Sequence, residues 1–197
     1  MGRRWGVSCA AVVMMVSMNV VAAGPSGAMS ATQLRGDALT LRQMPAGWFT
    51  HAPVGDPRLG CLAHLLEPAK VNETNYLEVY FVAKSDLPFV VETLTTYSST
   101  ASAFSKIASR LASCRSISGD LDGYRVTGTV RPVTVGRFGT ASVTYRIEVK
   151  GAHYTVMSYY AVVRKGSVIF AVLETDYPSV SLSQFRGFVV RAYAKVK

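Results

Sequence analysis

The side chains best suited to chemistry are basic residues that alternate with apolar ones along two predicted strands. Arg125 and Arg131 belong to the first strand, and Arg146 and Lys150 belong to the second. Successive side chains of a strand point to opposite faces, so these four cations share one face, which we call the basic strip, and Tyr159 of the next strand joins them. Arginine donates charge-assisted hydrogen bonds, so the strip suits an anionic or hydroxyl-rich ligand. The alternative interpretation is a solvated sheet face.

The sequence lacks the motifs that indicate catalysis or a cofactor. It has no G-x-S-x-G, no H-E-x-x-H, no glycine-rich phosphate loop and no nucleotide fingerprint. His51, His64 and His153 are not spaced as on one helix face, and the run 118–129 copies only part of a calcium loop because Thr129 stands where a bidentate Glu is needed. We therefore expect no catalytic residue, no cofactor and no metal. The alternative is a hydrolase whose residues come together only in space.

Composition and charge narrow the class of protein further. The chain has 197 residues, of which 49% are hydrophobic and 17% charged, so it can bury a core as one domain. Its 21 basic and 12 acidic residues give a formal charge of +9. Basic residues concentrate between Arg110 and Lys165, which points to anionic surroundings.

The N-terminus has the layout of an export signal. Two arginines precede an uncharged run from Gly6 to Ala23. We expect a signal peptide over 1–23 with cleavage after Ala23 or Ala28, because small residues precede both points. The run is slightly short for a membrane span, and an uncleaved anchor is the alternative. Export makes the protein secreted or extracytoplasmic and argues against nucleic acid as a partner.

Beyond the signal, the small and polar segment 24–37 is expected to be a flexible tether, followed by a single domain over 38–197. Removal of the signal leaves Cys61 and Cys114 as the cysteines of the mature chain. An even pair in an oxidising compartment predicts a disulfide between them. A redox or metal pair is the alternative, but the CxxC spacing is missing.

Hydrophobic periodicity predicts the elements that carry these residues. A spacing of three and four residues from Leu87 to Leu111 predicts an amphipathic helix, which the cluster Ser98-Ser99-Thr100 divides in two or leaves whole. Period-two or continuous apolar patterns predict strands, and a second helix comes after them. The strands are expected at 76–83, 124–131, 141–150, 154–163 and 168–173, and the last helix at 182–193. The order β-α-β-β-β-β-α predicts an α+β fold, an antiparallel sheet of five to six strands with helices packed on one face.

A family resemblance rests on residues 39–48, LTLRQMPAGW, and on the order of the segments after them. This run resembles the L-P-x-G-W opening of the PknH-like extracellular sensor domains of actinobacteria. The later segments are similar too: Cys61 after a loop, an apolar strand, then Pro88-Phe89-Val90 opening a helix that ends on Cys114. The chain carries no kinase domain, and it has one cysteine pair where the kinase version has two.

The resemblance implies a domain outside the membrane that binds an unidentified ligand in a cleft, either on a receptor serine/threonine kinase or alone as an exported protein. We therefore expect a non-enzymatic, exported domain that binds a ligand or partner of the cell envelope, such as an anionic lipid or polymer. Peripheral association with the membrane or cell wall fits this expectation. The alternatives are a secreted hydrolase and a structural envelope protein.

Overall fold

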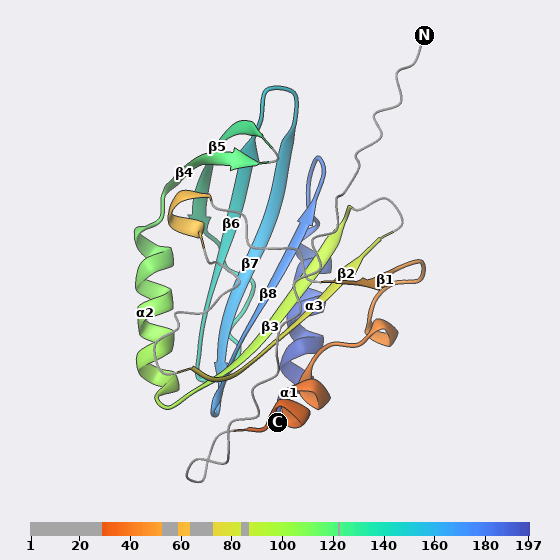
Figure 1. Ribbon diagram of the computed structural model, residues 1–197, viewed down its shortest axis with the longest axis vertical. Coiled ribbons are helices and arrows are strands. Elements are labelled where there is room, and N and C mark those ends of the chain that lie inside the picture. Colours follow the sequence, from red (N-terminus) through yellow and green to blue (C-terminus); the bar gives the residue numbers. More distant parts are fainter. Residues whose placement is uncertain (1–28, 53–58, 64–72, 84–86, 122) are drawn as a thin grey trace.

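Eight strands form one antiparallel sheet at the centre of the molecule (Figure 1). The computed structural model describes residues 29–52, 59–63, 73–83, 87–121 and 123–197. Across the sheet the strands lie in the order β1-β2-β3-β8-β7-β6-β5-β4. Their bounds are β1 Phe49–His51, β2 Glu73–Val82, β3 Phe89–Tyr97, β4 Ser116–Leu121, β5 Tyr124–Pro132, β6 Ala141–Lys150, β7 Thr155–Lys165 and β8 Val168–Asp176. The predicted α+β class is correct, but the expectation of five to six strands is wrong.

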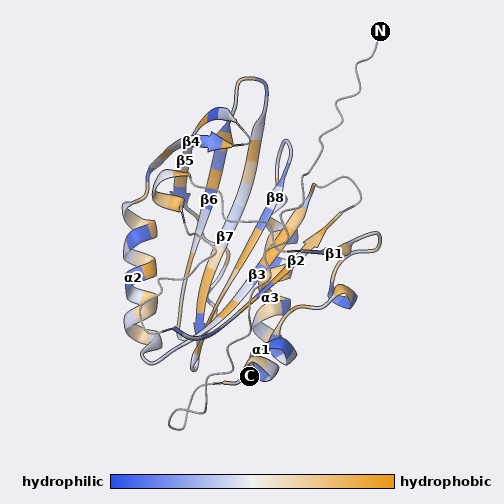
Figure 2. Cartoon of the chain, viewed as in Figure 1, coloured by the Kyte–Doolittle hydropathy of each residue, from blue (hydrophilic) through white to orange (hydrophobic). Residues whose placement is uncertain are grey.

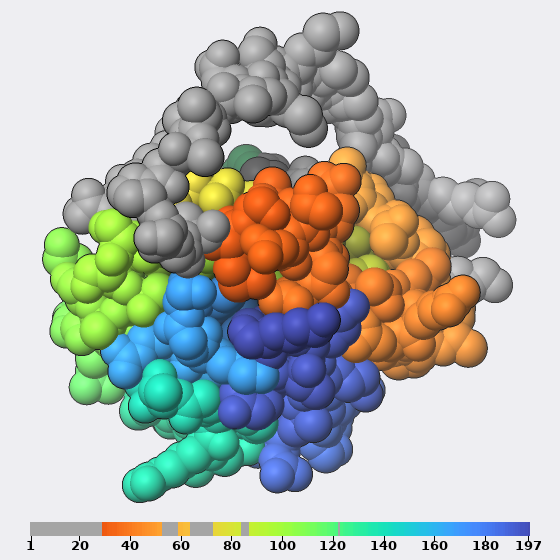
Figure 3. All heavy atoms as spheres, turned by 90° about the horizontal axis from the view of Figure 1, so that it is seen from below, coloured from red at the N-terminus to blue at the C-terminus, as the bar shows by residue number. Residues whose placement is uncertain are grey.

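The helices cover both faces of this sheet. Their bounds are α1 Ala31–Asp37, η1 Leu41–Gln43, η2 Gly60–Leu62, α2 Thr100–Ser113 and α3 Leu182–Lys195. Helix α2 packs against β3, β7 and β8 on one face, and α3 packs against β7 and β8 on the other. We call these the α2 face and the α3 face. Figure 3 shows α1 beside the C-terminal end of α3.

The prediction that helices pack on one face is wrong because the central strands are apolar on both sides. On β7, Ala161 and Val163 belong to the core under α3, whereas Tyr160 and Val162 belong to the core under α2. Figure 2 shows hydrophobic residues along β3, β7 and β8, in the middle of the sheet. Such strands need cover on each face, since apolar surface is driven out of water wherever it lies.

The predicted helix over 87–111 is half strand. Residues Phe89–Tyr97 form β3, which pairs with β2 and β8, and only Thr100–Ser113 is helical. The run from Thr93 to Thr96 is rich in β-branched threonine, which favours a strand, and apolar spacing of three or four residues does not exclude one when both faces are buried. Ser99 is the N-cap of α2, so the polar cluster marks where the helix begins rather than a break within it.

The tether predicted over 24–37 is wrong in its second half. That half is helix α1, which begins at a capping box between Ser30 and Gln33. Leu34 of this helix is fully buried against the core of the α3 face, so the helix is part of the domain. The expected signal peptide over 1–23 lies outside the described residues.

The last three strands and the last helix agree with prediction. Strands β6, β7 and β8 form an antiparallel meander, and β7 and β8 lie in the centre of the sheet. Ser181 caps α3 by accepting a hydrogen bond from the Gln184 N–H. Phe185 and Phe188 of α3 are fully buried, and Trp48 packs on Phe188 with ring centroids 5.8 Å apart. The segment before β1 is thereby fixed to the core.

Candidate functional site

The four cations of the basic strip lie on one face, as predicted. Register places Arg131 directly opposite Arg146, and Arg146 opposite Tyr159 of β7. Lys150 lies four residues after Arg146 on β6, and Arg125 lies six residues before Arg131 on β5. Because side chains alternate between faces along a strand, an even spacing places each pair on the same face. Because Tyr159 belongs to the core under α3, the strip lies on the α3 face, over strands that α3 leaves open.

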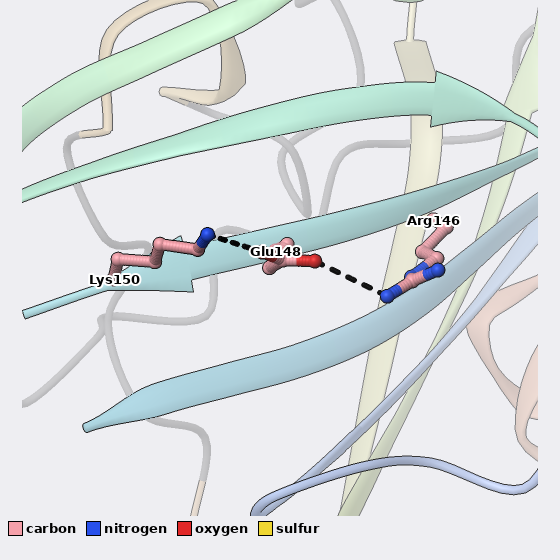
Figure 4. Close-up of polar contacts among 3 residues, drawn as sticks. All are labelled: Arg146, Glu148 and Lys150. Carbon is pink, nitrogen blue, oxygen red and sulfur yellow. Dashed lines mark hydrogen bonds and ion pairs between the residues drawn. The ribbon is translucent and has the colours of Figure 1, made fainter.

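A carboxylate that sequence reasoning did not include stands within the strip (Figure 4). Glu148 accepts a hydrogen bond from Arg146 at 3.1 Å through Oε2 and pairs with the Lys150 ammonium at 2.9 Å through Oε1. Lys150 is the main cause, with Arg146 and Arg131 adding to it, of a lowered pKa for this carboxyl group. Glu148 therefore neutralises part of the strip and holds two of its side chains in place.

Tyr159 has a different setting from the four cations. Its side chain is buried, and its ring lies 5.4 Å from that of Phe185 on α3. Arg125, Arg131 and Lys150 are exposed, and Arg146 is partly exposed. The tyrosine thus marks the boundary where the open strip meets the core under α3.

The predicted disulfide is present between Cys61 and Cys114, which are 53 residues apart with Cα atoms 5.7 Å apart. It joins η2 to the residue that ends α2. The calcium-like run 118–129 lies mostly in the hairpin of β4 and β5, where Asp120 is opposite Arg125. Its residues therefore pair two strands of the sheet.

The histidines are not brought together in the described residues. His51 lies in β1 with its ring 5.6 Å from that of Tyr80, and His153 lies in the turn between β6 and β7. His64 lies outside the described residues. Among those described, no group of three or more His, Cys, Asp or Glu side chains could hold a metal ion. No helix of the described part of the chain is long and apolar enough to cross a membrane.

Sequence reasoning missed a set of polar side chains on the α2 face. Tyr76 of β2 donates a hydrogen bond to Glu78 at 2.6 Å, and burial raises the pKa of its hydroxyl group. The buried Thr93 of β3 lies opposite Glu78. Farther across the sheet the Ser158 and Thr175 hydroxyl groups are hydrogen bonded at 2.8 Å, and both residues are buried. The signal was available at Glu78, the acidic residue within the otherwise apolar run 76–83.

Two carboxyl groups under α3 were also missed. Glu92 is fully buried and accepts a hydrogen bond from the Leu39 N–H at 2.6 Å, and Glu174 accepts one from the Gln184 amide at 2.8 Å. The second oxygen of each carboxyl group is buried and has no hydrogen-bond partner among the described residues. Burial raises the pKa of each to about 8. These groups therefore bear on stability and pH dependence.

Comparison with known proteins gives a fold and no family. No family model matches the sequence, and no curated protein does. Among solved structures, the chain is similar to the crystal structure of the extracellular domain of PknH from Mycobacterium tuberculosis, with a TM-score of 0.67. The match covers 85% of this chain and 96% of that chain at 10% sequence identity, so it shows a shared fold.

Proposed function

We propose that this chain is an exported, sensor-like domain that binds an anionic ligand of the cell envelope at the basic strip. The observation that carries the proposal is the strip itself: four basic side chains on one open sheet face, with Glu148 and Asp120 as the acidic residues facing them among the described residues. The sum of four positive and two negative charges leaves a net charge of +2, which attracts anions.

Two further findings support an extracytoplasmic location. The fold is similar to that of a protein described as an extracellular domain, and a disulfide is typical of an oxidising compartment. Export is tested by the intact mass of protein recovered from the culture medium or envelope. We expect a chain that begins after Ala23 or Ala28, and a mass that includes residues 1–23 would contradict cleavage.

Binding is tested with three anionic probes: poly-L-glutamate, a polyglycerol phosphate and vesicles of phosphatidylglycerol. We expect at least one of them to bind at low salt and to bind more weakly at physiological salt, where the Debye length falls to about 8 Å. The variant Arg125→Glu/Arg131→Glu removes two exposed cations and should abolish most of this binding. Neither side chain makes a salt bridge among the described residues, so the fold should be unaffected.

A matched control reverses two exposed charges elsewhere. Lys106 lies on α2. Arg115 lies near Tyr145 of the α2 face. Burial raises the pKa of the Tyr145 hydroxyl group, and the charge of Arg115 acts in the opposite direction. The variant Lys106→Glu/Arg115→Glu should therefore bind each probe almost as well as the wild type. The proposal fails if no probe binds, or if the control variant loses as much binding as the variant of the strip.

The absence of enzymatic activity is part of the proposal and has its own test. A fluorophosphonate probe and a panel of ester substrates should give no labelling and no turnover above a heat-denatured sample. Turnover that is lost on substitution of a single residue would make the chain a hydrolase instead.

A further inference from the structure

Arg131 and Arg146 are an unusual pair for a sheet because they are like charges in directly opposed positions. Opposed residues of an antiparallel pair have Cβ atoms about 5 Å apart, and like charges there are destabilising. The fold compensates this cost only in part. Glu148 forms an ion pair with Arg146. With Arg131 its interaction is a longer-range electrostatic attraction, which lowers the pKa of Glu148.

Each oxygen of the Glu148 carboxylate already has a cationic partner. One oxygen accepts from Arg146 and the other from Lys150. Arg131 is exposed and makes no salt bridge within the part of the chain that the structure describes. Three cations with one carboxylate carry a net charge of +2, so the Arg131–Arg146 pair lacks a second anion.

The geometry of the donors favours phosphate over carboxylate as that anion. Each guanidinium group is a planar fork that matches two oxygen atoms. A carboxylate offers its two oxygens in one plane, whereas the tetrahedral phosphorus of a phosphodiester spreads its oxygens out of a plane, so two guanidinium groups on opposed strands can approach it from different sides. Exposed hydroxyl groups of Thr127 and Thr129, opposite Lys150 and Glu148, add neutral donors along the same face.

The surroundings of the strip favour an extended chain over a flat surface. Arg146 lies opposite Tyr159, whose ring packs on Phe185 of α3. Helix α3 therefore projects from the sheet next to Arg146, and the other cations of the strip lie along β5 and β6. A flat bilayer would meet the helix before it reached Arg146, whereas a single polymer chain can lie beside the helix along the strands.

We propose that the basic strip binds a linear phosphodiester polymer, with one phosphate group held between Arg131 and Arg146. This inference rests on the proposed function and specifies the ligand of the same site. Along β6 the Cα atoms of Arg146 and Lys150 lie roughly 14 Å apart, and their charged groups turn toward Glu148 between them, at 3.1 and 2.9 Å from its two oxygens. A polymer can contact both cations with different phosphate groups, which gains affinity that a single phosphate ion does not have.

The test compares polyglycerol phosphate with poly-L-glutamate of the same number of charges, with inorganic phosphate and with phosphatidylglycerol vesicles. We expect polyglycerol phosphate to bind about tenfold more tightly than poly-L-glutamate, and inorganic phosphate to bind far more weakly than either. The variants are Arg131→Gln, which removes charge and fork, Arg131→Lys, which keeps the charge, and Arg115→Gln as the matched control on the α2 face.

Arg131→Gln should weaken polyglycerol phosphate binding about tenfold, the loss of one charge-assisted contact. Arg131→Lys should weaken it severalfold while leaving poly-L-glutamate binding unchanged, and Arg115→Gln should change neither. Equal binding of the two polymers, or full retention by Arg131→Lys, overturns phosphate recognition while the proposed function stands. Binding of vesicles without the polymer overturns the linear ligand. No binding of any probe overturns both proposals.

Discussion

Glu92 is the residue whose chemistry is most altered by the fold. Burial raises the pKa of its carboxyl group from 4.5 to about 8, although the Leu39 N–H and Lys195 lower it. Asp37, also buried, acts in the same direction as burial. Folding therefore favours the protonated form, and the N-terminal segment at Leu39 is held by a group that is mostly neutral at pH 7.

The direction of this shift makes the protein less stable as the pH rises. Because the folded pKa exceeds the unfolded one, the contribution of Glu92 to stability is fully present below about pH 4.5 and is lost as the pH rises to 8. We expect the free energy of unfolding of the wild type to fall by about 3 kcal/mol between pH 5 and pH 8 from this group. Because Glu174 has a similarly raised pKa, the difference between the wild type and Glu92→Gln in urea unfolding at both pH values measures the part that belongs to Glu92.

The variant Glu92→Gln keeps an acceptor for the Leu39 N–H but cannot ionise, so it should be the more stable protein at pH 8. Glu148→Gln is the control, because the pKa of Glu148 is lowered and its stabilising effect is already complete at pH 5. A wild type with equal stability at pH 5 and pH 8, or a Glu92→Gln variant with the same pH dependence, would contradict a protonated carboxyl group at this position.

At the scale of elements, the sheet depends on a close approach at Gly128. A Cβ atom at this position of β5 would collide with the Glu148 carbonyl oxygen of β6 and lie 2.9 Å from Ile117 Cγ1 of β4. Gly128→Ala should therefore lower the free energy of unfolding by about 3 kcal/mol, since backbone on β6 cannot move away. Gly36→Ala in α1, which meets no atom within 4 Å, should have no cost. Equal urea midpoints for the two variants would refute the predicted contact.

The disulfide ties a second pair of elements together. Replacing both cysteines, Cys61→Ser/Cys114→Ser, should lower the free energy of unfolding by about 4 kcal/mol, because the unfolded chain regains the freedom of a 53-residue loop. Reducing the wild-type protein should give the same loss, and thiol labelling of the unreduced protein should find neither cysteine free. Labelling of both would show that the bridge does not form.

How far the sequence predicts these elements depends on how local their signals are. The meander β6-β7-β8 can be predicted from the alternation of β6, the continuous apolar runs of β7 and β8 and the glycines between them, because all of these signals are local. Strand β3 was missed because Val90, Val91 and Leu94 fit a helix and a strand equally well, and only the pairing with β2 and β8 decides between them. The polar side chains around Thr93 were missed with it.

The basic strip shows the same limit. Period two placed Arg131 and Arg146 on one face without knowledge of the fold, because alternation is a property of the strand alone. The direct opposition of the two arginines depends on register, and the contacts of Glu148 depend on side-chain conformation. The sequence therefore predicts a basic face. The structure is needed to show that Glu148 pairs with Arg146 and Lys150 and not with Arg131.

At the scale of the whole molecule, the fold offers two faces of different chemistry. The α3 face carries the basic strip beside its helix, and the α2 face carries buried hydroxyl groups and the Glu78 carboxylate. The similarity to the extracellular domain of PknH, at 10% identity and a TM-score of 0.67, shows a shared fold. Which face binds a ligand is the central question.

The measurement that answers it is a map of amide and arginine side-chain NMR shifts on addition of polyglycerol phosphate. We predict changes at Arg131, Arg146 and Lys150 that saturate together, and in Arg125→Glu/Arg131→Glu the changes at Arg146 and Lys150 should disappear. Changes confined to Thr93 and Ser158 on the α2 face would contradict binding at the basic strip and move the ligand site to the opposite side of the sheet.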